Sequence, residues 1–339
     1  MQKLDIRKRY SDTTLREFAD YVKEISARIG FKVSSRGWCY QLEQAGYITK
    51  DNFDKVTTLI NNCRKKGFLP VDFVAEDSPR EFKNIVTPDK DIDFESFLTD
   101  RLESVFDLGH HYTPDYWKGE KYYIQIVVEK TDLVTLFLPV CEKYKIPIAN
   151  SKGWSSVLQR AQYARRYAEA QANGNKCVLL YCGDHDPDGL RISDFLRKNL
   201  ADLKNVVWGD GMEGYDPADL IIERFGLNYD LIQRNNLTWI DNLITGSGKN
   251  LADPEHKNNK MPYVQTYLKD IGERKCEANA IVPMPEVARD LCEKSITKYL
   301  GADAPDRFYE KDQKIIQDYR EYLDNLGISG EVQDIIDRI

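Results

Sequence analysis

Four carboxylates in this 339-residue chain have the types and spacing needed to bind a divalent cation. Three of them alternate within GDHDPDG, residues 183–189, and the fourth lies upstream. Like charges held this close repel one another, and a bound cation relieves the repulsion. Because oxygen donors suit hard cations, we expect Mg²⁺, with Mn²⁺ as an alternative. The expected metal ligands are Glu129, Asp184, Asp186 and Asp188.

Histidine and cysteine do not form a competing metal site. His185 lies inside residues 183–189, which we call the acidic segment. We expect it near the metal but not bound to it. His110 and His111 are expected to be solvated or structural. The seven cysteines form no CxxC pair, and several lie in apolar segments. This pattern favours buried free thiols in a reducing cytoplasm over disulfides or zinc.

Two apolar stretches place the carboxylates at strand ends. Residues 122–128 (YYIQIVV) immediately precede Glu129, and residues 177–182 (CVLLYC) precede the acidic segment. Both have the length and composition of buried parallel strands, and a helix is expected over 190–200. The carboxyl ends of parallel strands form the ligand-binding edge of an open α/β sheet, so we expect the carboxylates to meet there.

An arginine and a tyrosine near the N-terminus form a second candidate group. Arg36 and Tyr40 are four residues apart in an expected helix over 36–45, capped by Ser35, so both lie on one face. A phenol is a nucleophile once deprotonated, and a nearby cation favours that state. The chain has 20 tyrosines, so this spacing also arises readily by chance, and a structural Tyr40 stays an alternative.

The first 75 residues show the order of a winged helix-turn-helix. Helices are expected over 13–29, 36–45 and 53–66, followed by an extended wing strand over 68–74. The third helix presents polar and basic residues to phosphates and base edges: Lys55, Asn61, Asn62, Arg64, Lys65 and Lys66. The alternative is a purely structural helical subdomain, since basic residues at a helix end also complement the helix dipole.

The remaining elements follow from the same patterns. The acidic, loop-rich residues 83–121 are expected to bridge two domains and to hold one helix near 94–106. Further on we expect a strand over 148–150 and helices over 155–172, 220–226, 274–300 and 308–322. The TGSGK sequence at 245–249 suggests a phosphate loop, but Leu243 stands where that motif needs glycine, so we assign no nucleotide site.

Charge and hydropathy limit the partners. The net charge of −7 speaks weakly against nucleic acid, but residues 1–50 are net positive, and a metal ion changes the local charge of the acidic site. No apolar run approaches the length of a membrane span, and the charged N-terminus does not resemble a secretion signal. We therefore expect a cytoplasmic protein without a membrane partner.

The order of the central elements resembles the Toprim domain. A strand that ends in Glu129, a βα crossover and a strand that ends in DxDxDG characterise that domain, which occurs in type IA and type II topoisomerases, bacterial primases and some nucleases. The resemblance covers residues 122–208, with Gly189 at the expected place. The alternative is an acidic turn in an ordinary doubly wound α/β domain, since aspartate favours such turns.

A winged helix followed by a Toprim domain resembles the topoisomerase VI A subunit and the related meiotic double-strand-break transesterases. In that family a winged-helix helix carries Ser/Thr-x-Arg-x-x-Tyr-Tyr, and the second tyrosine attacks DNA. Ser34, Arg36 and Tyr40 match this motif, whereas Cys39 stands where the family has an aromatic residue, and the two residues before Cys39 also differ.

The likeness extends into the C-terminal half, where Lys275-x-Glu277 is similar to a family motif. It implies an α/β protein with three parts. A winged-helix domain spans 1–82, a bridging segment spans 83–121, and a Toprim domain with a helical C-terminal extension spans 122–339.

The resemblance implies a type IIB topoisomerase-like enzyme that cleaves double-stranded DNA. Tyr40 would form a phosphotyrosyl link, Arg36 would stabilise the developing charge, and Mg²⁺ held by the carboxylates would stabilise the transition state. In that family the tyrosine meets the partner's metal site across a homodimer. A separate GHKL-type ATPase B subunit supports strand passage.

Two other functions stay open on the sequence alone. A Toprim metal nuclease, for example in defence against mobile elements, would hydrolyse DNA with water and leave Tyr40 structural. A non-catalytic DNA-binding protein would use the fold as a scaffold, although the retained carboxylates argue against it. A transesterase stays attached to DNA through Tyr40, a nuclease leaves free ends, and a binding protein tolerates loss of Asp184.

Overall fold

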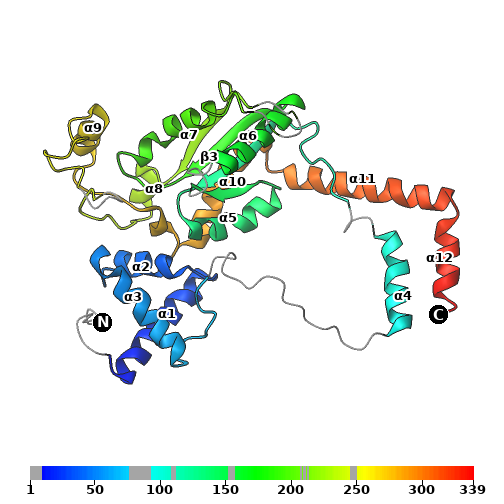
Figure 1. Ribbon diagram of the computed structural model, residues 1–339, viewed down its shortest axis with the longest axis horizontal. Helices are drawn as coiled ribbons and strands as arrows, with labels where there is room; N and C mark the ends of the chain where they lie inside the picture. Colours follow the sequence, from blue (N-terminus) through cyan, green and yellow to red (C-terminus); the bar gives the residue numbers. More distant parts are fainter. Residues whose placement is uncertain are drawn as a thin grey trace. The chain divides into compact units, whose positions relative to one another are not determined.

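The computed structural model describes residues 10–75, 93–107, 112–151, 157–206, 208, 211, 214–244 and 250–339 (Figure 1). Contacts divide the chain into two units. Unit 1 comprises Met1–Asp77 and Lys121–Tyr299, and unit 2 comprises Ser78–Glu120 and Leu300–Ile339. Every candidate catalytic or metal-binding residue belongs to unit 1.

Unit 1 contains a four-stranded sheet that is parallel throughout the described residues. Its strands are β1 (Tyr122–Val128), β2 (Ile148–Asn150), β3 (Lys176–Cys182) and β4 (Ile221–Gly226), in the spatial order β2-β1-β3-β4. β1 and β3 pair along their whole length, with Val128 opposite Cys182. The three strands expected from the sequence are confirmed, and the carboxyl ends of β1 and β3 lie side by side.

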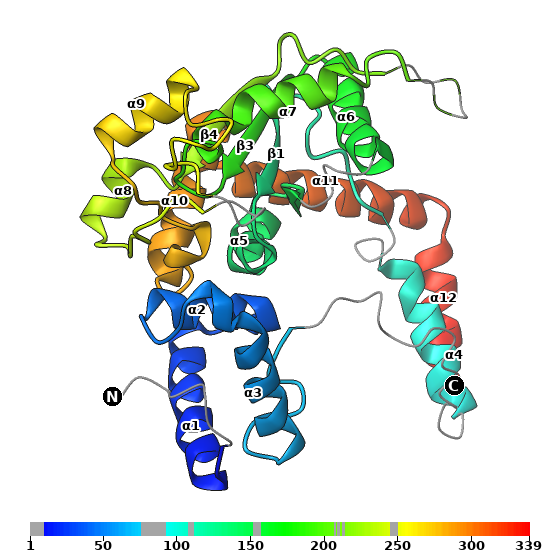
Figure 2. The same ribbon diagram turned by 60° about the vertical axis from the view of Figure 1, so that its left-hand side comes forward.

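Helices cover both faces of this sheet. α5 (Thr131–Lys143) packs on β1 and β2, whereas α6 (Val157–Ala172) contacts β3 and α7 (Ile192–Ala201) contacts β4. Figure 2 shows α5 on one face and α6 and α7 on the other. Because both faces are covered, every residue of β1 and β3 after the first is buried, which explains why their sequences are mostly apolar. The chain is therefore a mixed α/β protein.

Within the described part of unit 1, three α-helices precede the sheet: α1 (Asp12–Ile29), α2 (Ser35–Gln44) and α3 (Phe53–Lys65). Ser11 caps α1 by accepting a hydrogen bond from the Thr14 N–H, and Gly30 ends the helix with a φ of 76°. The cap of α2 is Ser34, one residue before the expected Ser35. The three helices are otherwise confirmed, and both α1 and α2 contact α3.

Two predictions about secondary structure are wrong. Residues 68–74 form turns instead of a wing strand. Pro70 has no N–H to donate to a strand ladder, and its carbonyl accepts from Phe73 N–H within a turn. Residues 220–226, expected to be helical, contain β4 instead. Its β-branched start suits a strand, and Ile221 lies opposite Val178 of β3.

The chain after β4 holds α8 (Tyr229–Arg234), α9 (Pro262–Asp270), a 3₁₀ helix (Ala278–Ile281) and α10 (Pro285–Leu300). The expectation of one helical stretch over 274–300 is therefore only partly correct. Cys276 instead pairs with His185 in an isolated antiparallel bridge, so the chain around Cys276 runs beside the acidic segment. The glycine-rich residues 245–249 and the pair His110 and His111 lie outside the described residues.

Unit 2 contains α4 (Phe94–Glu103), α11 (Ala304–Asn325) and α12 (Ile328–Ile336). These confirm the helices expected near 94–106 and over 308–322. Arg307 of α11 pairs with Glu120 at 2.8 Å, and the Tyr116 hydroxyl donates to Asp312 at 2.8 Å. Polar contacts of this kind attach α11 to the segment that precedes β1.

The expectation of buried free thiols is confirmed for all seven cysteines. Among the helices that the structure describes, none combines the length and apolar composition of a membrane-crossing segment.

Candidate functional site

The sheet brings Glu129 and Asp184 together at the carboxyl ends of β1 and β3, as the expected strand positions imply. Glu129 follows β1, and its backbone N–H donates to the Cys182 carbonyl at 2.9 Å. Its Oε2 accepts from the Asp184 backbone N–H at 2.7 Å and from the Tyr181 hydroxyl at 3.4 Å. The Glu129 carboxylate is therefore held against the start of the acidic segment.

A lysine lies between these two carboxylates. Lys130 Nζ is 2.8 Å from Asp184 Oδ2 and 3.3 Å from Glu129 Oε1, and all three side chains are largely buried. Burial acts to lower the pKa of Lys130, but Asp184 and Glu129 outweigh it and hold that pKa well above its ordinary value. Burial raises the pKa of Asp184 even with Lys130 beside it. One ammonium group thus faces two buried carboxylates.

Two glycines and an arginine shape the acidic segment. A Cβ on Gly183 would lie 2.7 Å from Glu129 Oε2, and one on Gly189 would collide with the Asp184 carbonyl. Neither position can therefore take a larger residue without moving the site. Arg224 of β4 donates through Nη2 to the carbonyls of Gly183 and Asp184 at 2.6 and 2.8 Å. Its Nη1 donates to the Gly189 carbonyl at 2.9 Å, so the arginine holds both ends of the segment.

The other two aspartates bond to different groups. Asp186 Oδ1 accepts from the Gly189 N–H at 2.6 Å, and Asp188 Oδ1 accepts from the Tyr263 hydroxyl at 2.9 Å. Burial raises the pKa of Asp186 above its ordinary value of 3.8, and the charge of Asp184 raises it further. Asp186 is thus electrostatically coupled to Asp184, whereas Asp188 is bonded to α9.

The segment around Lys275 encloses the acidic site from the other side. The Ala278 N–H donates to Asp184 Oδ1 at 2.7 Å, so both carboxylate oxygens of Asp184 have partners. Lys275 and Glu277, the residues of the Lys-x-Glu resemblance, are buried and form an ion pair at 3.5 Å. Lys275 also donates to a backbone carbonyl at 2.6 Å. The Lys275–Glu277 pair therefore adjoins Asp184, because the next residue, Ala278, donates to the Asp184 carboxylate.

Arg36 and Tyr40 meet on one face of α2, beside Lys130. Interaction with the Tyr40 hydroxyl raises the pKa of Arg36, so the two side chains lie near each other, as their spacing implies. Lys130 Nζ lies 5.5 Å from the centroid of the Tyr40 ring, within the range of a cation–π contact. The ring also packs edge-on against Phe53, with centroids 5.1 Å apart. Lys130 thus contacts Tyr40 and also Glu129 and Asp184, which we call the acidic pair. Tyr40 and the acidic pair therefore belong to one site.

A close approach at Gly37 positions α2. A Cβ on Gly37 would collide with the Asp132 carboxylate, which lies in the first turn of α5. Asp132 Oδ1 accepts from the Ser34 N–H at 3.0 Å, and Gln41 Nε2 donates to the Asn279 carbonyl at 3.2 Å. The absence of a side chain at Gly37 therefore allows α2 to approach α5 closely.

The donor set fits a hard divalent cation in its chemistry, but the ligands are not assembled. Within the described part of the chain, no group of three or more His, Cys, Asp or Glu side chains is placed to hold a metal ion. Glu129 and Asp184 each give one oxygen to a backbone N–H and the other to Lys130. An ion bound by these two carboxylates would therefore compete with Lys130 for their oxygens.

Some of the basic residues expected to present a surface on the third helix bond to other parts of the protein instead. Arg64 Nε donates to the Val71 carbonyl at 2.7 Å, and Lys66 forms an ion pair with Asp12. Lys55 and Lys65 are exposed. The surface available to phosphates is thus smaller than the sequence alone suggests.

Three residues of the site were not identified from the sequence. Lys130 follows Glu129 directly, so its place at a strand end was a usable signal. Arg224 lies in a segment expected to be helical, and the wrong secondary structure concealed its role. Asp132 contacts Ser34 across a separation of 98 residues, and no spacing rule predicts such a contact.

A search of known protein families finds no match to this chain, and a search of curated proteins finds none either. A function for the chain therefore has to come from the residues of the site.

Proposed function

We propose that this chain is a DNA-cleaving transesterase, similar in chemistry to the A subunit of topoisomerase VI. Tyr40 is the nucleophile, Arg36 stabilises its phenolate, and Glu129 and Asp184 form the centre of the acidic site. The first step leaves the chain joined to an end of double-stranded DNA through a phosphotyrosyl link. The proposal depends above all on one observation, that Lys130 contacts both the Tyr40 ring and the acidic pair.

Two cations beside Tyr40 support this chemistry. A phenol is a weak nucleophile at neutral pH because almost all of it is protonated. Positive charge beside the oxygen favours the phenolate and also attracts the phosphate that is to be attacked. Arg36 interacts with the phenol, and the Lys130 ammonium lies near its ring.

The proposed step exchanges one phosphoester for another. The Tyr40 oxygen attacks a backbone phosphorus and loses its proton, the bond from phosphorus to the sugar oxygen breaks, and that sugar oxygen takes up a proton. The phosphotyrosyl ester retains a phosphoester bond. Attack by the sugar hydroxyl in the reverse direction would therefore reseal the DNA and release Tyr40.

A divalent cation is part of the proposal. The oxygens of Glu129, Asp184 and Asp186 would hold Mg²⁺ or Mn²⁺, with Asp188 as a fourth candidate. When bound, such an ion stabilises negative charge on the phosphate oxygens. Because Lys130 binds two of the same carboxylates, we expect metal binding and the Lys130 ion pairs to compete.

A homodimer and a separate GHKL-type ATPase are also part of the proposal, because the family resemblance implies both. In that family each tyrosine faces the metal site of the partner subunit. Here Tyr40 lies beside the acidic residues of its own chain. We therefore propose that nucleophile and carboxylates act within one chain, and that two copies cut the two strands.

Trapping the covalent link tests the proposal. The protein is mixed with supercoiled plasmid and Mg²⁺ or Mn²⁺ and quenched with SDS, and the DNA ends are examined for attached protein. We expect protein-linked ends from the native chain and from the control Tyr47→Phe, but none from Tyr40→Phe. Free ends from all three proteins would identify a metal nuclease with a structural Tyr40. Binding without any cleavage would identify a DNA-binding protein.

Mixed dimers test whether the site lies within one chain. Tyr40→Phe and Asp184→Asn chains are each expected to be inactive. If each active site takes its tyrosine and carboxylates from one chain, a mixture of the two variants stays inactive. If the site is shared across the dimer, the mixture regains one complete site per mixed dimer, and protein-linked DNA returns.

A further inference from the structure

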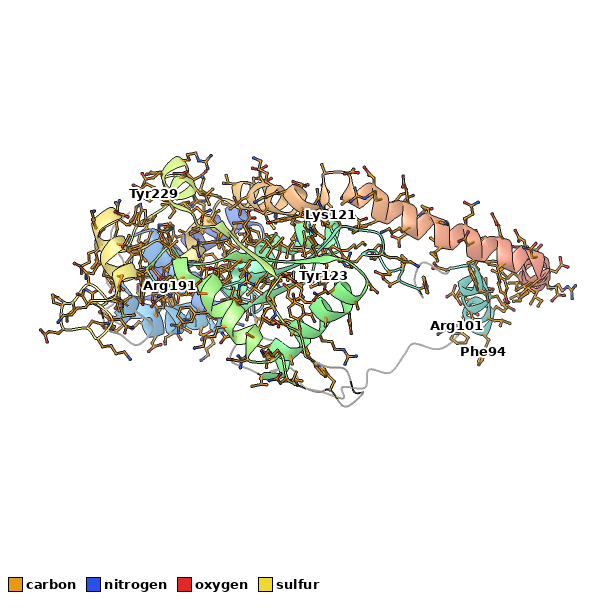
Figure 3. All side chains as sticks on the ribbon, turned by 90° about the horizontal axis from the view of Figure 1, so that it is seen from above. Phe94, Arg101, Lys121, Tyr123, Arg191 and Tyr229 are labelled. Carbon is orange, nitrogen blue, oxygen red and sulfur yellow. The ribbon has the colours of Figure 1, made fainter. Side chains whose placement is uncertain are left out.

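A cavity of about 480 Å³ lies beside the acidic segment and has no role in the cleavage step. The acidic segment, α8 and α9 form its walls. Its ring-bearing residues are His185, Tyr229, Tyr263 and Tyr267, and its charged residues are Arg191 and Asp270. Figure 3 labels Arg191 and Tyr229 at the end of the sheet where α9 lies. Mainly apolar walls with a few polar groups, at this volume, are typical of a ligand site.

His185 is the polar group in this cavity that most clearly needs a ligand. The residue is 4% exposed, and Nδ1 lies 2.8 Å from the Leu227 carbonyl. Since a carbonyl only accepts, Nδ1 carries the proton, and Nε2 of the neutral ring is an acceptor. Nε2 is buried and has no hydrogen-bond partner among the described residues. Burying an unmade hydrogen bond is unfavourable, so a donor from a ligand would relieve it.

The cavity borders the acidic segment, because His185 and Pro187 of that segment line it. His185 lies between Asp184 and Asp186 in the chain, and the Tyr263 hydroxyl donates to Asp188 at 2.9 Å. The Arg191 guanidinium stacks 4.6 Å from the centroid of the Tyr263 ring. A ligand in the cavity would therefore contact residues that are bonded to, or adjacent in sequence to, the candidate metal ligands.

We propose that this cavity takes an unpaired nucleobase of DNA bound at the acidic segment. The inference rests on the proposed function, since it places the DNA backbone beside Asp184. The flat face of the base packs against the tyrosine rings, and an N–H on its edge donates to His185 Nε2. Every nucleobase has a planar face, and adenine, cytosine and guanine carry exocyclic amino groups that donate.

Two single strands of equal length test this proposal, one of adenine nucleotides and one of abasic nucleotides. Both carry the same phosphate charge, so a difference in affinity reports the base alone. With fluorescein labels, Mg²⁺ and anisotropy as the readout, we expect the native chain to bind the adenine strand roughly tenfold tighter. Gel analysis after each titration confirms that the strands are intact.

Variants identify the cavity as the source of this preference. Thr266 lines the cavity from an exposed position, so Thr266→Trp fills it without disturbing the core and is expected to abolish the preference. Met261, just before α9, is exposed and does not line the cavity, so Met261→Trp is the matched control and keeps the preference. His185→Asn retains a donor for Leu227 but lacks the Nε2 acceptor, and should reduce the preference roughly fivefold.

Three results would overturn the proposal: equal affinity of the native chain for both strands, binding of neither strand, or a preference that survives Thr266→Trp. The test is separable from the trapping experiment because it needs no cleavage. A native chain that prefers the adenine strand but never becomes linked to DNA supports the base site and refutes the transesterase. Linkage to DNA without base preference supports the reverse conclusion.

Discussion

The acidic segment and Tyr40 of α2 lie in one site, but different kinds of contact hold them in place. Asp184 makes hydrogen bonds through its backbone N–H, its carbonyl and both carboxylate oxygens. Tyr40 is positioned by ring contacts with Phe53 and Lys130 and lies close to Arg36. Hydrogen bonds impose direction, whereas ring packing is tolerant of small displacements.

This difference separates stability from chemistry within the site. The acidic segment buries several charges, so changes there alter the free energy of unfolding directly. The Tyr40 hydroxyl contributes little packing, so its loss should affect the reaction alone. We therefore expect substitutions in the acidic segment to be costly to stability, and Tyr40 to be replaceable without loss of the fold.

The largest effect is expected for Lys130→Met. Two buried carboxylates lose their cation, so the free energy of unfolding should fall by about 3–5 kcal/mol, measured by urea denaturation. The control is Lys143→Met, which removes an exposed ion pair with Glu293 and should cost less than about 1 kcal/mol. Equal stability of the two variants would show that the Lys130 pairs do not hold the acidic site.

Lys130→Met also tests whether Lys130 and a metal ion compete for the same carboxylates. Without Lys130, the Glu129 and Asp184 carboxylates are open to an ion, so Mg²⁺ should raise the melting temperature of Lys130→Met more than that of the native chain. Removal of Mg²⁺ with EDTA should reverse the rise. If Mg²⁺ stabilises both proteins equally, the ion does not bind where Lys130 lies.

Arg224→Lys should have the next largest effect. Lysine keeps the charge but cannot reproduce the planar set of donors that reaches three carbonyls of the acidic segment. We expect a loss of about 2–3 kcal/mol in unfolding free energy, together with faster amide exchange in residues 183–189. Arg234→Lys, whose native arginine donates to one exposed carbonyl, is the control and should change little. A segment that stays protected in Arg224→Lys would contradict the role given to this arginine.

Asp186→Asn should stabilise the protein at neutral pH. Burial raises the pKa of Asp186 in the folded state, so the folded chain binds this proton more tightly than the unfolded chain. Stability contributed by the group is therefore lost as pH rises from 3.8 through the raised pKa. An amide avoids that loss and can still accept from Gly189.

Thermal melts check this prediction. At pH 7 we expect the melting temperature of Asp186→Asn to exceed that of the native chain by about 2–4 °C, with the difference disappearing as pH falls below 4. The exposed Asp253→Asn serves as the control and should leave the melting temperature at pH 7 unchanged. A lower melting temperature at pH 7 would show that the Asp186 charge stabilises the fold.

The smallest effect on stability is expected for Tyr40→Phe. Phenylalanine keeps the edge contact with Phe53 and the ring beside Lys130, so unfolding free energy should change by less than about 0.5 kcal/mol. The same variant should lose all protein-linked DNA. A large loss of stability would mean that the hydroxyl is structural and would weaken the comparison between the two regions.

Local patterns were sufficient to locate the main elements of unit 1. The strands before Glu129 and before Asp184 are short apolar runs bounded by polar residues, and the α1 helix has a clear cap and a glycine at its end. Such signals depend only on residues close together in the sequence, so they can be recognised without knowledge of the fold. Residues 220–226 were misread because a short apolar run fits either a helix or a strand until its pairing partner is known.

The sequence by itself determined which residues can do chemistry: the four carboxylates, the Arg36–Tyr40 spacing and the strand ends that carry Glu129 and Asp184. Only the tertiary structure decided that Lys130 joins Tyr40 to the acidic pair, that Arg224 holds the acidic segment, and that His185 lines a cavity with an unpartnered nitrogen among the described residues. Side-chain types and helical or strand periodicity are local properties that can be read along the chain. Contacts between residues far apart in sequence depend on how strands pair and helices pack, and no local spacing encodes them.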